Sequence, residues 1–243
     1  MQDNKNHIPP DDRAEFPLMM RLMTRRTMLG ATGLGGAALA IAACGEGTLS
    51  TAAALASPRQ DVVIAAGTFV LDFSTDVGVL NYAYALEQLE AAFYIQVVAT
   101  AGFGTRFAAN EQRVLIDLRD HEIVHREFFK TALGGAAIPG LTVDFSGIDF
   151  TSRTSVLNTA RTFEDLGVGA YNGAAKYISR ADYLTAAGKI VSVEARHASA
   201  IRDLLANRTG SFAPDTFDPA LTPTFVLAQA DPFVVDTITA INT

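Results

Sequence analysis

The sequence predicts an all-α fold, a bundle of four long helices with one long crossover between the second and the third. Three observations predict it. Four long stretches repeat apolar side chains at the helical period of 3.6 residues. Each stretch has a glutamate on its apolar face, and in two of them a histidine follows that glutamate three residues later. The connection between the two middle stretches is much longer than antiparallel neighbours need, which is typical of a crossover.

The first helix is expected over about residues 75–100 and the second over 110–133. Asn110 is a favourable N-cap, and Glu111 places a negative charge in the first turn, where the helix dipole favours it. Gly134 and the glycine after it are expected to end the second helix. These two helices should form the first antiparallel hairpin of the bundle.

The third helix is expected over about residues 155–180 and the fourth over 182–207. The crossover before them, residues 134–154, contains Pro139, several glycines and a short extended segment at 141–145. After the fourth helix, residues 212–224 are expected to form a loop. A short C-terminal helix is predicted to begin at Asp231-Pro232, because a capping side chain followed by proline favours a helix start.

The two histidine motifs are Glu122-Ile-Val-His125 and Glu194-Ala-Arg-His197, and each follows a helix with a single glutamate. Residues three apart are neighbours on one helix face. At 1.5 Å per residue, both partners in each hairpin lie about 18–22 Å from the connecting turn, and therefore at one height. One Glu and one Glu-x-x-His from each hairpin is the known ligand pattern of a four-helix di-metal carboxylate site. The predicted ligands are Glu87, Glu122, His125, Glu164, Glu194 and His197.

Other residues near these motifs have alternative interpretations. Glu90 competes with Glu87 for the ligand position on the first helix, being one turn further along. Glu87 is favoured because Tyr94 follows it by seven residues, just as Tyr171 follows Glu164. His121 lies about 100° around the helix from Glu122, so we expect it to flank the site or contact a ligand rather than bind metal.

The Glu-to-Tyr spacing belongs to an internal near-repeat, in which residues 86–94 (LEQLEAAFY) align with residues 163–171 (FEDLGVGAY). Residues 70–207 resemble a bacterial ferritin-like domain, of the branch that includes the desiccation-related proteins. The segment 80–94 (LNYAYALEQLEAAFY) is the most family-like part. The resemblance implies a ferritin-like four-helix bundle in which Glu122 and Glu194 bridge two metal ions.

The resemblance also implies a cofactor of two Fe ions, with Mn or a mixed Fe/Mn pair as alternatives. Tyr94 and Tyr171 match positions that contact ligands or are redox-active in relatives; otherwise they only fill the core. The expected function is a di-iron oxidoreductase acting on O2 or peroxide. The alternative is a non-enzymatic envelope or desiccation-stress protein with a vestigial or structural site. A closed iron-storage shell fits less well with the long crossover, the tether and the C-terminal extension, and a monomeric or dimeric size in solution would exclude it. A homodimer is the assembly that we consider.

Residues 1–44 resemble a targeting sequence. Arg25 and Arg26 lie in a segment (TRRTML) that resembles a twin-arginine export motif, and the apolar run after it is shorter than the ~20 residues of a bilayer span. The run ends in IAACG, which resembles a lipobox with Cys44 as the acylated residue. The alternatives are an uncleaved N-terminal anchor, or cleavage after a small residue with Cys44 incidental. We therefore expect an export signal at 1–44, a tether at 45–66 and a domain at 67–243.

The composition of the chain restricts the classes of partner and site that we expect. A net charge of −7 without a basic cluster in the body of the chain gives no support for a nucleic-acid partner. An acidic surface is repelled by anionic lipid, so membrane attachment is expected through the lipid anchor alone. The single cysteine excludes a disulfide framework and a Cys-rich metal site. The expected partners are O2 or peroxide and the twin-arginine export machinery, and the expected location is the periplasm or cell envelope.

Overall fold

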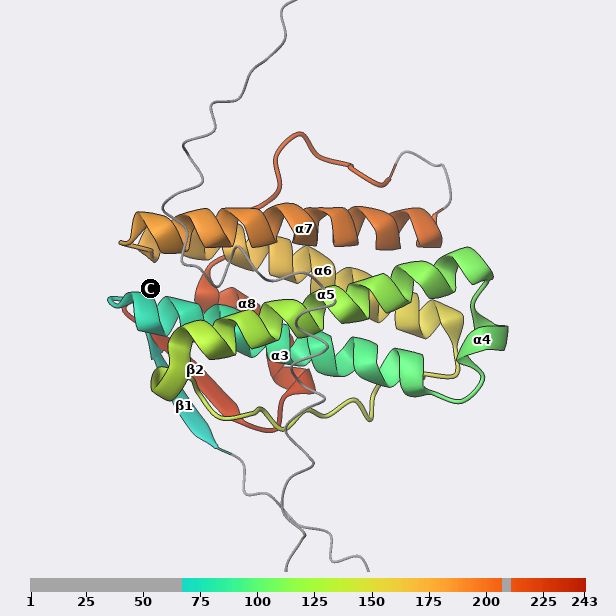
Figure 1. The fold of residues 1–243 in the computed structure, drawn as a ribbon, viewed down its shortest axis with the longest axis horizontal. Coiled ribbons are helices and arrows are strands. Elements are labelled where there is room, and N and C mark those ends of the chain that lie inside the picture. Colours follow the sequence, from blue (N-terminus) through green and yellow to red (C-terminus); the bar gives the residue numbers. More distant parts are fainter. Residues whose placement is uncertain (1–66, 207–210) are drawn as a thin grey trace, which may run out of the picture. The chain divides into compact units, whose positions relative to one another are not determined.

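The computed structural model describes residues 67–206 and 211–243. Four long helices make up most of this part of the chain and lie alongside one another (Figure 1). The predicted export signal (1–44, with Arg25, Arg26 and Cys44) and the tether (45–66) lie outside the described residues. The helices and strands are β1 (Thr68–Asp72), α3 (Asp76–Ala99), α4 (Phe103–Arg106), α5 (Ala109–Leu133), α6 (Arg153–Ala174), α7 (Ala181–Leu205), α8 (Pro223–Ala230) and β2 (Thr237–Ile241).

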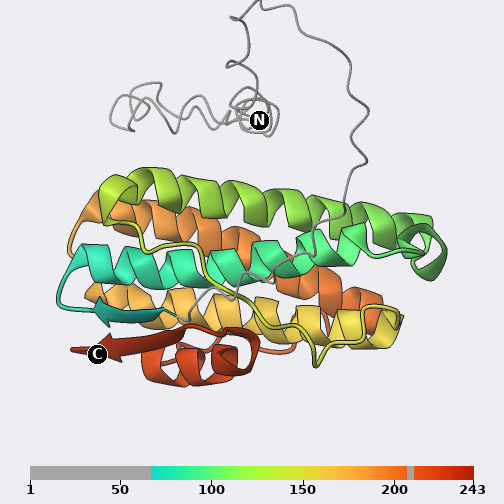
Figure 2. The same cartoon turned by 90° about the horizontal axis from the view of Figure 1, so that it is seen from below.

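The bundle has the predicted topology. Helix α3 packs against α5, and α6 packs against α7, so each hairpin is one compact pair. The crossover between α5 and α6 runs along the length of the bundle before α6 begins (Figure 2). The fold class expected from the sequence, an all-α bundle with a long crossover between its second and third helices, is confirmed.

Helix α3 is buried on nearly all sides within the domain. Its polar residues bind the crossover that covers it. The Asn81 side-chain amide donates to the Ala136 carbonyl (2.9 Å) and accepts from the Ile138 N–H (2.8 Å). The Leu141 N–H donates to the Gln88 side-chain oxygen (2.9 Å). These bonds satisfy buried polar groups and hold the crossover against the helix that carries Glu87.

A two-stranded parallel sheet, absent from the sequence-based expectation, joins the two ends of the domain. Strand β1 pairs with β2 over five residues, from Thr68 with Thr237 to Asp72 with Ile241. Just before β2, the buried Asp236 carboxylate accepts hydrogen bonds from the Gly67 N–H (2.5 Å) and the Thr142 N–H (2.6 Å). One side chain thus connects the domain's first strand, its crossover and its C-terminal segment. The short extended segment predicted at 141–145 contributes a single bridge, from Val143 to Val234.

Two helix boundaries predicted from the sequence were wrong. Helix α6 ends at Ala174 and continues only as a 3-10 turn, Ala175–Tyr177, rather than reaching residue 180. The C-terminal helix is α8, which begins inside the predicted loop. Its cap is Thr222, whose hydroxyl accepts from the Phe225 N–H (3.3 Å), with Pro223 in the first turn. The same cap-then-proline signal at Asp231-Pro232 yields only a 3-10 turn.

The start of α5 also differs from the prediction. The helix begins at Ala109 with Ala108 as its N-cap residue, so Asn110 lies inside the first turn. The Glu111 carboxylate accepts from the Ala108 N–H (2.8 Å) and so supplies the missing side-chain cap. Among the helices of the described ranges, none combines the length and the apolar character needed to cross a bilayer.

Candidate metal centre

The structure brings all six predicted ligand residues together in the middle of the bundle. Helix α3 contributes Glu87, α5 contributes Glu122 and His125, α6 contributes Glu164, and α7 contributes Glu194 and His197. All four glutamates are completely buried, and the two histidines are nearly so. The cluster forms because each residue lies on the inward face of its helix, and the antiparallel hairpins place those faces at one height.

The cluster divides into two groups of four side chains. In each group the ligand atoms lie within 4.8 Å of one another. Both groups contain Glu122 and Glu194, so these two carboxylates stand between the groups. The groups are Glu87, Glu122, His125 and Glu194, and Glu122, Glu164, Glu194 and His197. Each of the two groups could hold a metal ion.

In each group a histidine Nδ1 lies within 3.5 Å of three carboxylate oxygens. The His125 Nδ1 lies 2.9 Å from Glu194 Oε1, 3.4 Å from Glu87 Oε2 and 3.5 Å from Glu122 Oε2. The His197 Nδ1 lies 2.9 Å from Glu122 Oε1, 3.4 Å from Glu164 Oε2 and 3.4 Å from Glu194 Oε2. Adjacent ligands about 2.1 Å from one ion are roughly 3 Å apart, so these spacings fit atoms that share a cation.

Unpartnered polar atoms identify the same cluster. In the described ranges, eleven buried side-chain nitrogen and oxygen atoms lack a hydrogen-bond partner, and eight of them belong to the six residues. Both oxygens of Glu122 and of Glu194 are unpartnered, but only one oxygen of Glu87 and of Glu164. The two shared carboxylates therefore each have two oxygens without a hydrogen-bond partner. Glu87 and Glu164, which we call the terminal glutamates because each belongs to one group only, have one such oxygen each. Buried polar atoms without partners are costly, and metal coordination would supply the missing interactions.

Tyrosines hold the remaining oxygens of the terminal glutamates. The Tyr94 hydroxyl on α3 donates to Glu164 Oε1 on α6 (2.5 Å), and the Tyr171 hydroxyl on α6 donates to Glu87 Oε1 on α3. Each tyrosine of the internal repeat therefore binds the glutamate of the other copy. This reciprocal contact joins the two hairpins and directs the free oxygen of each glutamate toward the centre.

Burial and mutual charge shift the pKa values in the cluster. Burial raises the pKa of Glu164 to about 8, although the nearby His197 acts in the opposite direction. Burial likewise raises the pKa of Glu87 well above its ordinary value. For Glu122 burial also acts upward, but the two adjacent imidazoles outweigh it and its pKa lies below the ordinary range. Without a cation, the cluster must therefore share protons among its carboxylates and imidazoles.

Glu90 is a fifth buried carboxylate beside the cluster, and it is not in either ligand group. Burial raises its pKa well above the ordinary value, and Glu122 and the other three cluster glutamates raise it further. In the internal repeat its counterpart is Gly167, and a Cβ added there would lie 3.0 Å from Glu90 Oε1. The glycine on α6 therefore makes the space that the Glu90 carboxylate occupies. Of the two rivals on α3, the structure places Glu87 in the ligand group.

His121 contacts a predicted ligand, which agrees with the expectation that it flanks the site. Its Nδ1 lies 2.8 Å from the Nε2 of His197, on the side of that ring away from the carboxylates. Sequence spacing predicted that His121 lies on a neighbouring face of α5. It did not predict the contact with His197 on α7, because that contact depends on how the two helices pack. The repeat gave no signal for Glu90, since its counterpart is a glycine.

Comparison with known families agrees with this geometry. A family model described as a ferritin-like domain matches residues 75–207, which is more than half of the 243-residue chain. The matched range begins at the N-cap of α3 and ends just after α7, so it covers all four ligand-bearing helices. A comparison with curated proteins gives no match. From the match over the four helices, we conclude that the chain belongs to the ferritin-like domain family.

Proposed function

We propose that this protein binds two iron ions, or an iron and a manganese ion, and that the loaded site is redox-active toward O2 or peroxide. The observation that carries the proposal is the agreement between unpartnered atoms and ligand groups. The two carboxylates with both oxygens unpartnered, Glu122 and Glu194, are the two that belong to both groups. Four glutamates would balance the charge of two divalent cations, and mixed carboxylate–imidazole donors suit iron and manganese.

Bound iron would supply the chemistry, because two Fe(II) ions give the two electrons that, with two protons, reduce peroxide to water. The chain's own residues exclude water from the site, since the four glutamates are completely buried. Tyr94 and Tyr171 orient the terminal glutamates through their hydroxyl groups. A catalytic cycle would need electrons from outside the chain, whose single cysteine cannot form a Cys-x-x-Cys centre.

We further propose that the domain acts outside the cytoplasm, attached to the membrane by lipid on Cys44. The support is the sequence alone, in the paired Arg25 and Arg26 and the lipobox-like segment that ends the apolar run. A twin-arginine route carries folded proteins, which would allow the site to load metal before export. Fractionation of cells that express the full-length chain tests this proposal. We expect the protein in the membrane fraction, and we expect Cys44→Ala, or an inhibitor of lipoprotein processing, to change that distribution.

Metal content tests the central proposal. Purified protein is loaded anaerobically with Fe(II), desalted, analysed for iron per chain and then exposed to air while its optical spectrum is recorded. We expect two iron ions per chain and a spectral change on oxidation, as two ligand groups require. Less than one ion per chain would contradict the proposal.

A matched pair of variants on α5 makes the test specific. The double variant Glu122→Ala/His125→Ala removes ligands from both groups and should lose both ions. The variant Glu127→Ala removes a carboxylate of the same helix that pairs with Arg126 (2.7 Å) outside the cluster, and it should bind iron like the wild type. In cells, the non-enzymatic alternative requires the double variant to protect against stress as well as the wild type does, whereas our proposal requires loss of protection.

A further inference from the structure

The residue before the ligand glutamate differs between the two histidine-bearing helices. His121 immediately precedes Glu122 on α5, and the corresponding residue before Glu194 on α7 is Val193. Both positions are half-buried. Val193 has no polar atom in its side chain, whereas the imidazole of His121 reaches across to the other histidine-bearing helix. His197 therefore has an imidazole neighbour from the other hairpin, whereas Val193, at the equivalent position, offers no polar side-chain atom to His125.

The contact between His121 and His197 has the geometry of an in-plane hydrogen bond. The nitrogen–nitrogen distance is 2.8 Å and the two ring planes differ by only 15°. The ring centroids are 5.1 Å apart, which is too far for face-to-face stacking and fits two rings lying edge to edge. In that arrangement the lone pair of one nitrogen points along the N–H of the other.

Proton positions follow from what lies on each side of His197. Its Nδ1 faces the glutamates, at 2.9 Å from Glu122 Oε1, and a metal ion there requires Nδ1 to be unprotonated. The ring proton must then be on Nε2, which donates to Nδ1 of His121. His121 is the acceptor that fixes both the ring orientation and the tautomer that binds metal.

We propose that His121 is a positioning residue that orients His197 for metal binding and makes the two metal positions unequal in affinity. This inference rests on the proposed metal-binding function. The ion held by Glu122, Glu164, Glu194 and His197 gains from the contact, whereas the ion held with His125 does not use it. Loss of a hydrogen bond to a ligand histidine typically weakens metal affinity by about 10–100-fold.

Anaerobic titration of the full domain with Co(II) tests the inference, because its visible absorption reports each equivalent as it binds. His121→Leu keeps the bulk but removes the acceptor, and we expect one of the two equivalents to weaken by about 10–100-fold. His121→Asn retains an acceptor oxygen near the position of Nδ1 and should bind both equivalents more nearly like the wild type. Val193→Leu is the control at the equivalent half-buried position and should leave both unchanged.

The outcomes separate this inference from the proposed function. If the wild type binds two ions and His121→Leu does so with unchanged affinities, the inference is overturned while the function stands. Equal weakening of both equivalents, or equal losses in the Leu and Asn variants, overturns it as well, because the acceptor would then not be the cause. If the wild type binds less than one ion, the proposed function fails and the inference falls with it.

A second measurement reads the hydrogen bond itself. Nitrogen-15 NMR of histidine-labelled, Zn(II)-loaded protein distinguishes protonated from unprotonated ring nitrogens. We expect a slowly exchanging proton on Nε2 of His197, and its exchange should become faster in His121→Leu. A His197 Nε2 proton that exchanges at the same rate in the wild type and in His121→Leu would overturn the inference, because that proton would have no partner in His121.

Discussion

At the scale of single residues, the unusual feature is a concentration of buried charge. Carboxylates are rarely fully buried unless they are paired or bind metal, yet Glu87, Glu122, Glu164 and Glu194 are all completely buried within one cluster. Two tyrosine hydroxyls satisfy one oxygen each of Glu87 and Glu164. The remaining oxygens belong, with the two histidines, to groups that could hold a metal ion.

The tyrosine contacts should contribute measurably to stability. Tyr94→Phe removes the donor to Glu164 and leaves a buried oxygen without a partner. We expect the free energy of unfolding of the metal-free protein to fall by about 1–3 kcal/mol. Urea denaturation followed by circular dichroism measures it. Tyr171→Phe should have a similar effect through Glu87, and a negligible loss in both variants would show that these hydroxyls do not stabilise the glutamates.

Glu90 should destabilise the metal-free protein at high pH. In the described part of the chain no ion pair or hydrogen bond to this carboxylate is formed, and the charged groups that act on it are other carboxylates. Glu90→Gln removes the ionisable group, so we expect the unfolding free energy to rise by roughly 1 kcal/mol at about pH 8. At about pH 5 the gain should be smaller, because Glu90 keeps its proton there. A gain that is the same at both pH values would contradict this explanation.

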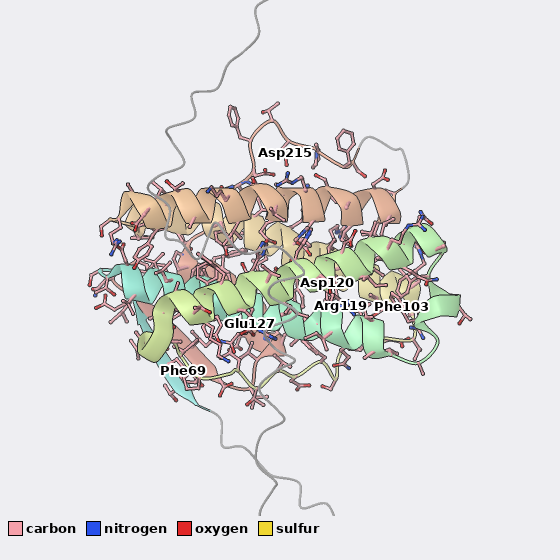
Figure 3. The ribbon with its side chains drawn as sticks, in the orientation of Figure 1. Phe69, Phe103, Arg119, Asp120, Glu127 and Asp215 are labelled. Carbon is pink, nitrogen blue, oxygen red and sulfur yellow. The ribbon has the colours of Figure 1, made fainter. Side chains whose placement is uncertain are left out.

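At the scale of elements, α6 is adapted to its neighbours by its glycines. Gly167 leaves space for Glu90, and Gly169 and Gly173 lie against Leu221 in the segment that leads into α8. The Leu221 N–H also donates to the Gly169 carbonyl (2.9 Å). Glycine costs helix stability, so Gly169 and Gly173, one turn apart and both against Leu221, indicate that close packing outweighs helix propensity here. Asp215, labelled in Figure 3, lies in the loop between α7 and α8, ahead of Leu221 in the chain.

Two glycine-to-alanine substitutions should therefore have opposite signs. A Cβ at Gly173 would lie 1.7 Å from the Leu221 carbonyl oxygen, so Gly173→Ala must displace the segment and should cost about 1–3 kcal/mol. Gly188 is exposed on α7 with no atom near its missing Cβ, and Gly188→Ala should gain about 0.5–1 kcal/mol. Thermal unfolding of both variants measures the difference. A stabilised Gly173→Ala variant would show that the close approach to Leu221 is unimportant.

At the scale of the whole molecule, the centre lies where two similar hairpins meet. Helices α3 and α6 exchange tyrosine–glutamate contacts, and α5 and α7 both supply the histidines. The crossover and the β1–β2 sheet close the bundle around α3, since Asp236 binds both Gly67 and Thr142. Any loosening of the hairpins relative to each other would separate ligands, so metal binding and global stability should be coupled.

The raised pKa values in the cluster predict that the stability of the metal-free protein depends on pH. In the metal-free protein the pKa of Glu164 is raised from 4.5 to about 8, so the folded state holds a proton that the unfolded chain releases. The stabilisation is complete below the unfolded pKa and is lost as pH rises toward 8. The raised pKa values of His125 and His197 act in the same direction above 6.5. The midpoint of thermal unfolding should therefore fall between about pH 5 and pH 8.

Metal loading should reverse this trend. Divalent cations replace the shared protons, and metal binds more tightly as the ligands lose protons, so the stabilisation by metal should grow with pH. Differential scanning calorimetry of metal-free and Mn(II)-loaded protein at both pH values measures it. A difference in midpoint that is constant or shrinks with pH would mean that the ions do not replace protons in this cluster.

The sequence by itself determined the bundle and the inward face of each ligand helix. Helical periodicity is local, so the spacing of Glu122 and His125 already placed both on one face, and antiparallel geometry gave the common height with Glu87. The predicted helix ends were less accurate where the sequence offers more than one capping residue. For example, Thr222-Pro223 begins a helix, whereas Asp231-Pro232 yields only a 3-10 turn.

Only the tertiary structure decided the contacts between helices and between the ends of the chain. The short strands β1 and β2 have too little local signal to be recognised, because their pairing joins residues that are far apart in the sequence. The crossed tyrosine contacts, the space for Glu90 beside Gly167 and the pairing of His121 with His197 depend on how faces pack. Periodicity fixes which way a side chain points from its own helix, whereas packing determines which residue it meets.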